Sequence, residues 1–203
     1  MKHYLIYIVS VLSFMSCSKD VDFSKSVMIY DKELTDLPAY SEWGYNTFGV
    51  YYDREVLISN DKEVPLKVIV TNNQTTFVFT GQKGNYSYYY NYTYHPMTLS
   101  LTLTDYVPTV YSDLSVLHDS TIRLNSKNCI VELNFDDTTK IPVKVIDGQF
   151  YFKRIQKVTV DKKPQELILS GYFDFKALIN GKPITFSNGR FDLGLANANF
   201  YKY

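Results

Sequence analysis

The chain has 203 residues, with 21 basic and 21 acidic side chains, and 45% of its residues are hydrophobic. At this length we expect one domain with enough apolar material for a core. A near-neutral chain without a cluster of basic residues has no positively charged surface to attract the phosphates of nucleic acid. This argues against a nucleic-acid-binding protein.

Residues 1–16 have the features of an export signal. Lys2 and His3 precede a largely apolar run over residues 4–15, shorter than the about 20 residues that a membrane-spanning helix needs. The run ends at Ser16 and Cys17, and residues 12–17 resemble a bacterial lipobox, in which the cysteine is acylated and becomes the new N-terminus. We therefore expect Cys17 to carry acyl chains such as palmitate and to hold the protein on the outer membrane, at the cell surface or the periplasmic face. A plain secretory signal, with Cys17 incidental, is the alternative.

Cleavage after residue 16 leaves 20 basic and 21 acidic residues, a net charge of −1. Residues 17–40 are mixed and polar, so we expect a lipidated N-terminus and a tether there, followed by a single β-domain over residues 41–203. Cys129 is then the one remaining cysteine, so it has no partner for an internal disulfide. It lies in an alternating run over residues 129–135, which predicts a buried, inert thiol.

Alternation of apolar and polar residues dominates the chain beyond residue 41 and predicts about a dozen strands. Turn signals separate the runs at short intervals, and one helical turn is expected near residues 111–117. We therefore expect an all-β fold, an antiparallel β-sandwich, with a closed lipocalin-like β-barrel as the alternative. The apolar positions are Leu66, Val68, Val70, Phe77, Phe79, Leu99, Leu101, Leu103, Leu167, Leu169, Phe173, Phe175, Phe191, Leu193 and Leu195; the turn signals are at residues 59–61, 71–73, 81–85, 136–137, 147–148, 180–181 and 188–189.

A row of alternating tyrosines is the candidate ligand-binding surface. A strand over this segment would put all five rings on one side, where flat amphipathic rings can stack on sugars. The competing interpretation is a core strand that pairs with residues 98–104 across a hairpin turn at His95 and Pro96, with Leu99 and Leu101 facing the tyrosines. The row consists of Tyr86, Tyr88, Tyr90, Tyr92 and Tyr94.

Two glycine-containing blocks lie near the ends of the β-domain. Gly49, inside a strand pattern, predicts a bulge or a close backbone approach, and Asn188 with Gly189 predicts a tight turn. The blocks, residues 42–51 and 180–192, resemble the two ends of an uncharacterised family of Bacteroides-type envelope lipoproteins, with Asn-Thr-Phe-Gly near the start and Gly-Arg-Phe-Asp near the end. The resemblance implies an all-β extracytoplasmic domain and transfers no catalytic residue.

Catalytic and metal-binding motifs are missing from the sequence. The two histidines beyond the signal, His95 and His118, lie far apart, and there is no HExxH, no cysteine pair and no glycine-rich phosphate loop, so we expect no metal, no cofactor and no enzyme activity. A glycan hydrolase would need two carboxylates about 5 to 10 Å apart, brought together from distant strands. Ser120 and Thr138 match an Asp-Ser/Thr-Xaa pattern that resembles bacterial O-glycosylation acceptors, and both lie in predicted loops.

These features predict a lipid-anchored cell-envelope protein with a binding or structural role. Its partners are the membrane, through the lipid on Cys17, and a glycan or an envelope protein. The alternative is an assembly subunit of an envelope complex without a soluble ligand, and a glycan hydrolase is the third hypothesis.

Overall fold

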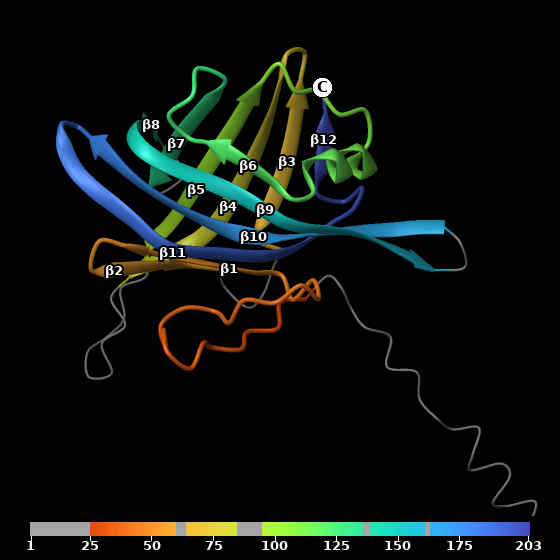
Figure 1. Cartoon of the computed structure of the whole chain (residues 1–203), viewed down its shortest axis with the longest axis horizontal. Helices are drawn as coiled ribbons and strands as arrows, with labels where there is room; N and C mark the ends of the chain where they lie inside the picture. Colours follow the sequence, from red (N-terminus) through yellow and green to blue (C-terminus); the bar gives the residue numbers. More distant parts are fainter. Residues whose placement is uncertain (1–24, 60–63, 85–94, 136–138, 161–162) are drawn as a thin grey trace, which may run out of the picture.

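The computed structural model describes residues 25–59, 64–84, 95–135, 139–160 and 163–203. These residues form twelve strands and one 3₁₀ helix (Figure 1). Among them no helix has the length and hydrophobicity to cross a membrane. The elements are β1 (Thr47–Tyr52), β2 (Glu55–Ile58), β3 (Leu66–Thr71), β4 (Gln74–Gly84), β5 (His95–Thr104), η1 (Tyr111–Leu117), β6 (Ser120–Arg123), β7 (Cys129–Phe135), β8 (Thr139–Pro142), β9 (Lys144–Val160), β10 (Lys163–Ile179), β11 (Lys182–Leu195) and β12 (Phe200–Lys202).

The strands form one curled antiparallel sheet, in the order β6-β9-β10-β11-β1-β2-β4-β5-β7-β8. β3 joins the edge of β4, and β12 adds a short parallel pair with β3. In Figure 1 the long strands β9, β10 and β11 cross in front of β3, β4 and β5, so the two halves of the sheet face each other. The all-β antiparallel class expected from the sequence is confirmed.

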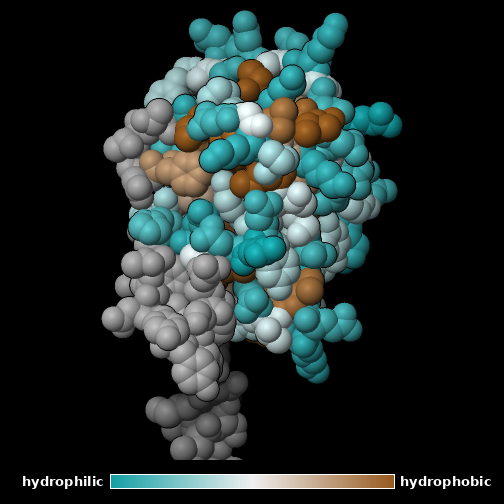
Figure 2. Space-filling model, turned by 90° about the vertical axis from the view of Figure 1, so that its left-hand side faces the viewer, coloured by the Kyte–Doolittle hydropathy of each residue, from teal (hydrophilic) through white to brown (hydrophobic). Residues whose placement is uncertain are grey.

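Phenylalanine rings fill the space between the two halves. Phe77 and Phe79 of β4 meet Phe152 and Phe150 of β9, with ring centroids 5.5 and 5.4 Å apart. Each such ring contributes roughly 1.5 to 3 kcal/mol through burial, so packing alone can stabilise the domain. Cys129 lies in the same core, where burial raises the pKa of its thiol to about 11, as expected for an inert cysteine. The face shown in Figure 2 is mostly hydrophilic, with hydrophobic residues in groups between the hydrophilic ones.

Several local predictions are confirmed. Asn72 and Asn73 form the turn between β3 and β4, and η1 covers the expected helical turn. Asn180 and Gly181 join β10 to β11 with positive φ angles of 50° and 77°. Such angles favour asparagine and glycine in two-residue hairpins.

Three predicted turns are wrong, because the residues lie inside strands. Residues 81–84 belong to β4, where Lys83 pairs with His95. The segments at 147–148 and 188–189 accompany register shifts in β9 and β11, and Asn188 has a φ of 55°. Glycine and asparagine permit a bulge that bends a long strand as readily as they permit a turn.

The predicted pairing of residues 98–104 with the tyrosine row is also wrong. Leu99 of β5 pairs with Phe79 of β4 on one side and with Leu133 of β7 on the other, so both edges of β5 are occupied. His95 and Pro96, expected in a turn, belong to β5. The alternating residues Phe77 and Phe79 offer β5 an equally apolar partner, and the ten residues that connect β4 to β5 exceed the short turn that we assumed. The five tyrosines of the row lie outside the described residues.

Candidate functional site

The segment before β1 packs against the outside of the sheet. We call residues 25–46 the strap; residues 17–40 were expected to be a tether, but the described part from residue 25 on lies along the sheet (Figure 1). The Leu37 side chain is fully buried against Val56 and Ile58. The strap also doubles back on itself, because Val27 donates a backbone hydrogen bond to the Tyr45 carbonyl at 2.8 Å.

Asp192 of β11 holds the loop at the end of the strap. Its carboxylate accepts hydrogen bonds from the backbone N–H groups of Trp43 (3.2 Å), Gly44 (2.9 Å) and Tyr45 (3.1 Å). The Ser41 hydroxyl donates a fourth. Asp192 is only 1% exposed, so its charge is stabilised almost wholly by these four donors. The loop backbone at Trp43 is therefore fixed in place.

Arg190, two residues earlier on the same face of β11, holds the middle of the strap. Its Nη1 atom lies 2.7 Å from the Asp31 carboxylate and 3.5 Å from the Pro38 carbonyl. Hydrogen bonds from the backbone N–H groups of Leu34 and Glu33, together with Arg190, lower the pKa of Asp31. The ion pair thus ties the strap to the sheet.

Gly49 lets the strap approach β1. A Cβ atom at this position would lie 2.4 Å from Cδ of Pro38, closer than real carbon atoms approach. The register of β1 against β11 also shifts between Gly49 and Tyr51. Both the bulge and the close approach predicted for Gly49 are confirmed.

A hollow of about 300 Å³ opens between the strap and β9. Two planar polar side chains of β9 form one wall: Arg154 donates to the Glu42 carboxylate at 2.8 Å, and the Gln156 amide donates to the Glu42 carbonyl at 2.7 Å. Trp43 also lines the hollow and is 72% exposed. The hollow is lined by Tyr40, Ser41, Glu42, Trp43, Arg154 and Gln156.

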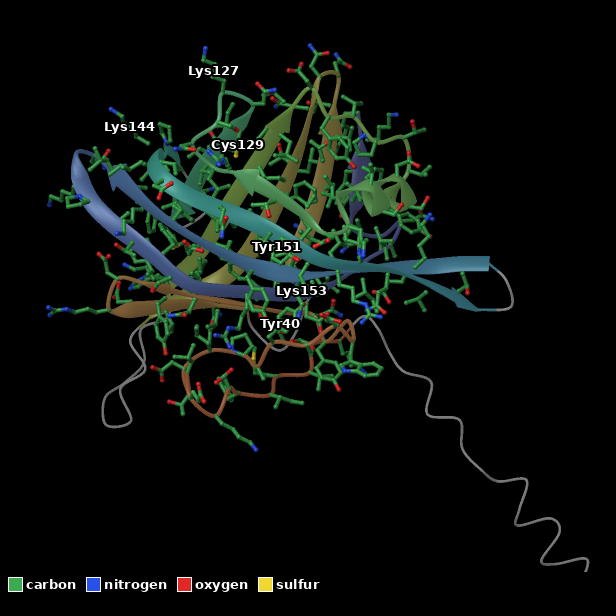
Figure 3. The ribbon with its side chains drawn as sticks, viewed as in Figure 1. Tyr40, Lys127, Cys129, Lys144, Tyr151 and Lys153 are labelled. Carbon is green, nitrogen blue, oxygen red and sulfur yellow. The ribbon has the colours of Figure 1, made fainter. Side chains whose placement is uncertain are left out.

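Tyr40 belongs to a stack of aromatic and cationic groups beside the hollow. Its ring packs on Tyr172 of β10, with centroids 4.3 Å apart, and the Lys153 ammonium lies 4.8 Å from the Tyr40 centroid. Figure 3 shows Tyr40 and Lys153 close together where the strap meets β9 and β10. The stack fixes the Tyr40 ring at the edge of the hollow.

Glu42 is ionised within this group. Burial alone would raise its pKa, but hydrogen bonds from Arg154, Tyr40 and Lys153 outweigh that effect and lower the pKa. The Tyr40 hydroxyl donates to Glu42 at 2.9 Å, and burial raises the pKa of this hydroxyl. The hollow therefore combines a fixed carboxylate, a guanidinium and an amide beside two aromatic rings.

Two further hollows lie elsewhere. The larger, about 570 Å³, lies over the outer face of β3, β4, β5 and β7, and its lining includes Thr76, Thr98, Ser100 and Asn134 but no aromatic side chain. The other surrounds the β1–β2 turn at Asp53. The first lacks an aromatic ring, and the ring that lines the second, Tyr52, is 8% exposed and packs in the core, whereas Trp43 is 72% exposed. The strap hollow is therefore the strongest candidate site.

Glu166 and Asp192 form a pair of buried carboxylates under the strap. Burial raises the pKa of Glu166 to about 7, and the Asp192 charge adds to this effect. Glu166 is 8% exposed, and in the described part of the chain its Oε2 atom has no hydrogen-bond partner. Neither carboxylate lines the three hollows, which differs from the accessible pair that a glycan hydrolase needs. No group of three or more His, Cys, Asp or Glu side chains among the described residues could hold a metal ion.

Of the site residues predicted from the sequence, Ser120 lies within the described part of the chain. Cys17, Thr138 and the tyrosine row lie outside the described residues. Ser120 begins β6 instead of lying in a loop, and its hydroxyl donates to the Leu117 carbonyl at 2.6 Å. The sequence analysis did not select Trp43 as a candidate site residue, although it is the single tryptophan of the chain and stands in a polar stretch.

The two motifs at the ends of the domain are neighbours in the sheet. Phe48 of the Asn-Thr-Phe-Gly motif pairs with Phe191 of the Gly-Arg-Phe-Asp motif, and Asn46 accepts a hydrogen bond from the Gly194 N–H at 2.8 Å.

Comparisons with known proteins found no matching family, no matching curated protein and no matching solved structure.

Proposed function

We propose that the protein is a lipid-anchored module of the cell envelope that binds a saccharide in the strap hollow. The observation that carries the proposal is Trp43, a large apolar ring that is 72% exposed on a loop fixed by Asp192. Exposure of such a ring to water is unfavourable, and a fixed backbone keeps it exposed without a ligand. A ligand that covers the ring removes this cost.

The chemistry of the hollow suits a sugar. A pyranose ring has an apolar face of C–H groups, which stacks on an aromatic ring such as Trp43, and a rim of hydroxyl groups. Glu42 can accept hydrogen bonds from those hydroxyls, whereas Arg154 and Gln156 can donate to them. A volume of about 300 Å³ is at the small end of ligand sites, which favours one or two sugar rings over a longer chain.

The anchor belongs to the same proposal. Cys17 precedes Lys25, the first described residue, by eight residues, a reach of at most about 28 Å in extended chain. Acylated Cys17 would thus hold the domain close to the outer membrane, at the cell surface or the periplasmic face. The resemblance of the two end motifs to an envelope lipoprotein family supports this location.

A glycan array tests the saccharide site directly. We expect purified wild-type protein to bind a limited set of saccharides, and Trp43→Ala to lower the affinity for them about tenfold, which corresponds to about 1.4 kcal/mol of lost stacking. Trp43→Phe keeps a flat ring and should retain part of the binding. Tyr203→Ala is the matched control, because Tyr203 is an exposed aromatic residue at the other end of the chain.

Equal binding by the wild type and by Trp43→Ala would contradict the proposal, provided that both unfold at the same urea concentration. An array without any bound saccharide would also contradict it.

A second candidate function is that of an assembly subunit. The far end of the β9–β10 hairpin, where Val160 pairs with Lys163, extends past the other strands in Figure 1 and offers a surface for a protein partner. A pull-down from solubilised envelope tests this candidate: recovery of one stoichiometric partner supports it, and recovery of none contradicts it.

A further inference from the structure

The strap exposes large aliphatic and aromatic side chains to solvent. Val27 is 48% exposed, Ile29 is 51% exposed and Tyr30 is 44% exposed, and Trp43 lies on the neighbouring loop. We call these four residues the strap surface. Buried residues such as Leu37 already hold the strap on the sheet, so the exposed ones are not needed for that attachment.

The strap surface lies where the chain coming from Cys17 enters the domain. The Lys25 carbonyl accepts a hydrogen bond from the Asn46 side chain at 3.2 Å, and Val27 is bonded to Tyr45. The first described residues therefore lie beside the loop that carries Trp43. A lipid on Cys17, eight residues earlier, would bring this side of the domain nearest to the bilayer.

We propose that the strap surface rests in the headgroup layer of the membrane that holds acylated Cys17; this inference rests on the anchor in the proposed function. Tryptophan and tyrosine favour this layer, since one part of the ring is apolar and another is polar. Within the strap, Lys25 and Lys32 are outnumbered by the carboxylates Asp31, Glu33, Asp36 and Glu42, so the strap has no basic cluster for an anionic surface. The partner is then a zwitterionic phospholipid surface bound by apolar contact.

This orientation identifies the source of the saccharide. The hollow is lined by Trp43, which also belongs to the strap surface, so this orientation would place the hollow beside the membrane. Its ligand is then the saccharide headgroup of a lipid in the same leaflet, and a soluble saccharide of the same structure serves as its analogue.

The single tryptophan makes a direct test possible, because all indole emission comes from Trp43. Full acylated protein is reconstituted in phosphatidylcholine vesicles with bromine atoms near the top of the acyl chains. We expect the emission to shift to shorter wavelength and its intensity to fall at least twofold, compared with vesicles of unbrominated lipid. Replacing Val27 and Ile29 by serine should weaken both effects.

The matched control moves the tryptophan to the other side of the molecule. In the double variant Trp43→Phe/Tyr203→Trp the indole lies at the C-terminal end, opposite the strap in Figure 1, and bromine should leave its emission unchanged. Vesicle flotation of wild type and Cys17→Ala measures the anchor separately.

The results separate the two claims. If acylated protein floats with the vesicles but Trp43 emits as it does in water and is not quenched, the membrane-facing strap is overturned and the anchor stands. If Cys17 is not acylated and the protein does not float, the anchor itself is overturned, and the inference that rests on it falls as well.

Discussion

The Oδ1 atom of Asp192 accepts a hydrogen bond from the N–H of Gly44 at 2.9 Å, across 148 positions in the chain. This contact joins the last long strand to the loop before the first strand, and it holds the backbone that presents Trp43. A single buried carboxylate thus connects the closure of the fold to the geometry of the candidate site.

Asp192→Asn should destabilise the domain. The amide is nearly the same size as the carboxylate, but its NH₂ group would face backbone N–H donors that need an acceptor, so we expect a loss of about 2 to 4 kcal/mol in the free energy of unfolding. Urea denaturation measures this loss. Asp174→Asn, on the exposed face of β10, is the control and should change stability by less than about 0.5 kcal/mol. Equal stability of the two variants would contradict the role given to Asp192.

Glu166 should make the protein less stable as the pH rises through neutrality. The folded chain retains the Glu166 proton up to about pH 7, whereas the unfolded chain loses it near pH 4.5. The stabilising effect is therefore complete below pH 4.5 and is lost as the pH rises through 7, with a total of about 3 kcal/mol.

Glu166→Gln isolates this effect from the other titrating groups. Glutamine is neutral at every pH, so the difference in unfolding free energy between variant and wild type should favour the variant increasingly from pH 4.5 to pH 8. Urea denaturation across this range measures the difference. A constant difference over the whole range would show that the Glu166 pKa is not raised.

Arg190→Met should loosen the strap. The variant keeps most of the apolar stem but leaves Asp31 and the Pro38 carbonyl without the guanidinium, at a cost of about 2 to 3 kcal/mol. Limited proteolysis should then cut within residues 25–40 faster than in the wild type. The control is Arg123→Met on the exposed part of β6. Unchanged cleavage of the strap in Arg190→Met would contradict its role as a clamp.

The strands were predictable because alternating apolar and polar residues in the sequence correspond to the buried and exposed faces of the strands. Val131 and Leu133, for example, face the core as the pattern over residues 129–135 predicts. The pairing of the strands was not predictable in the same way: Leu99 could satisfy its apolar face with Phe79 as well as with a tyrosine, and alternation alone does not choose between them. Asn188 shows the same limit, because a residue that permits positive φ suits a bulge as well as a turn.

The candidate site was not predictable from local sequence. Trp43, Arg154 and Asp192 come from the strap, β9 and β11, and only the folded sheet brings them together. The polar composition of residues 17–40 indicated a tether, but one buried leucine, Leu37, and one ion pair suffice to hold the described part on the sheet. The signal available in the sequence was that the single tryptophan stands in a polar stretch.

The most direct test of a saccharide site at the strap hollow is a titration of Trp43 fluorescence with the saccharides selected by the glycan array. We expect a saturable change in indole emission with the wild type, at the same saccharide concentrations that give binding on the array. Asp192→Asn, which releases the loop, should weaken this response. Binding of the saccharide without any change in Trp43 emission would place the ligand elsewhere and contradict the account.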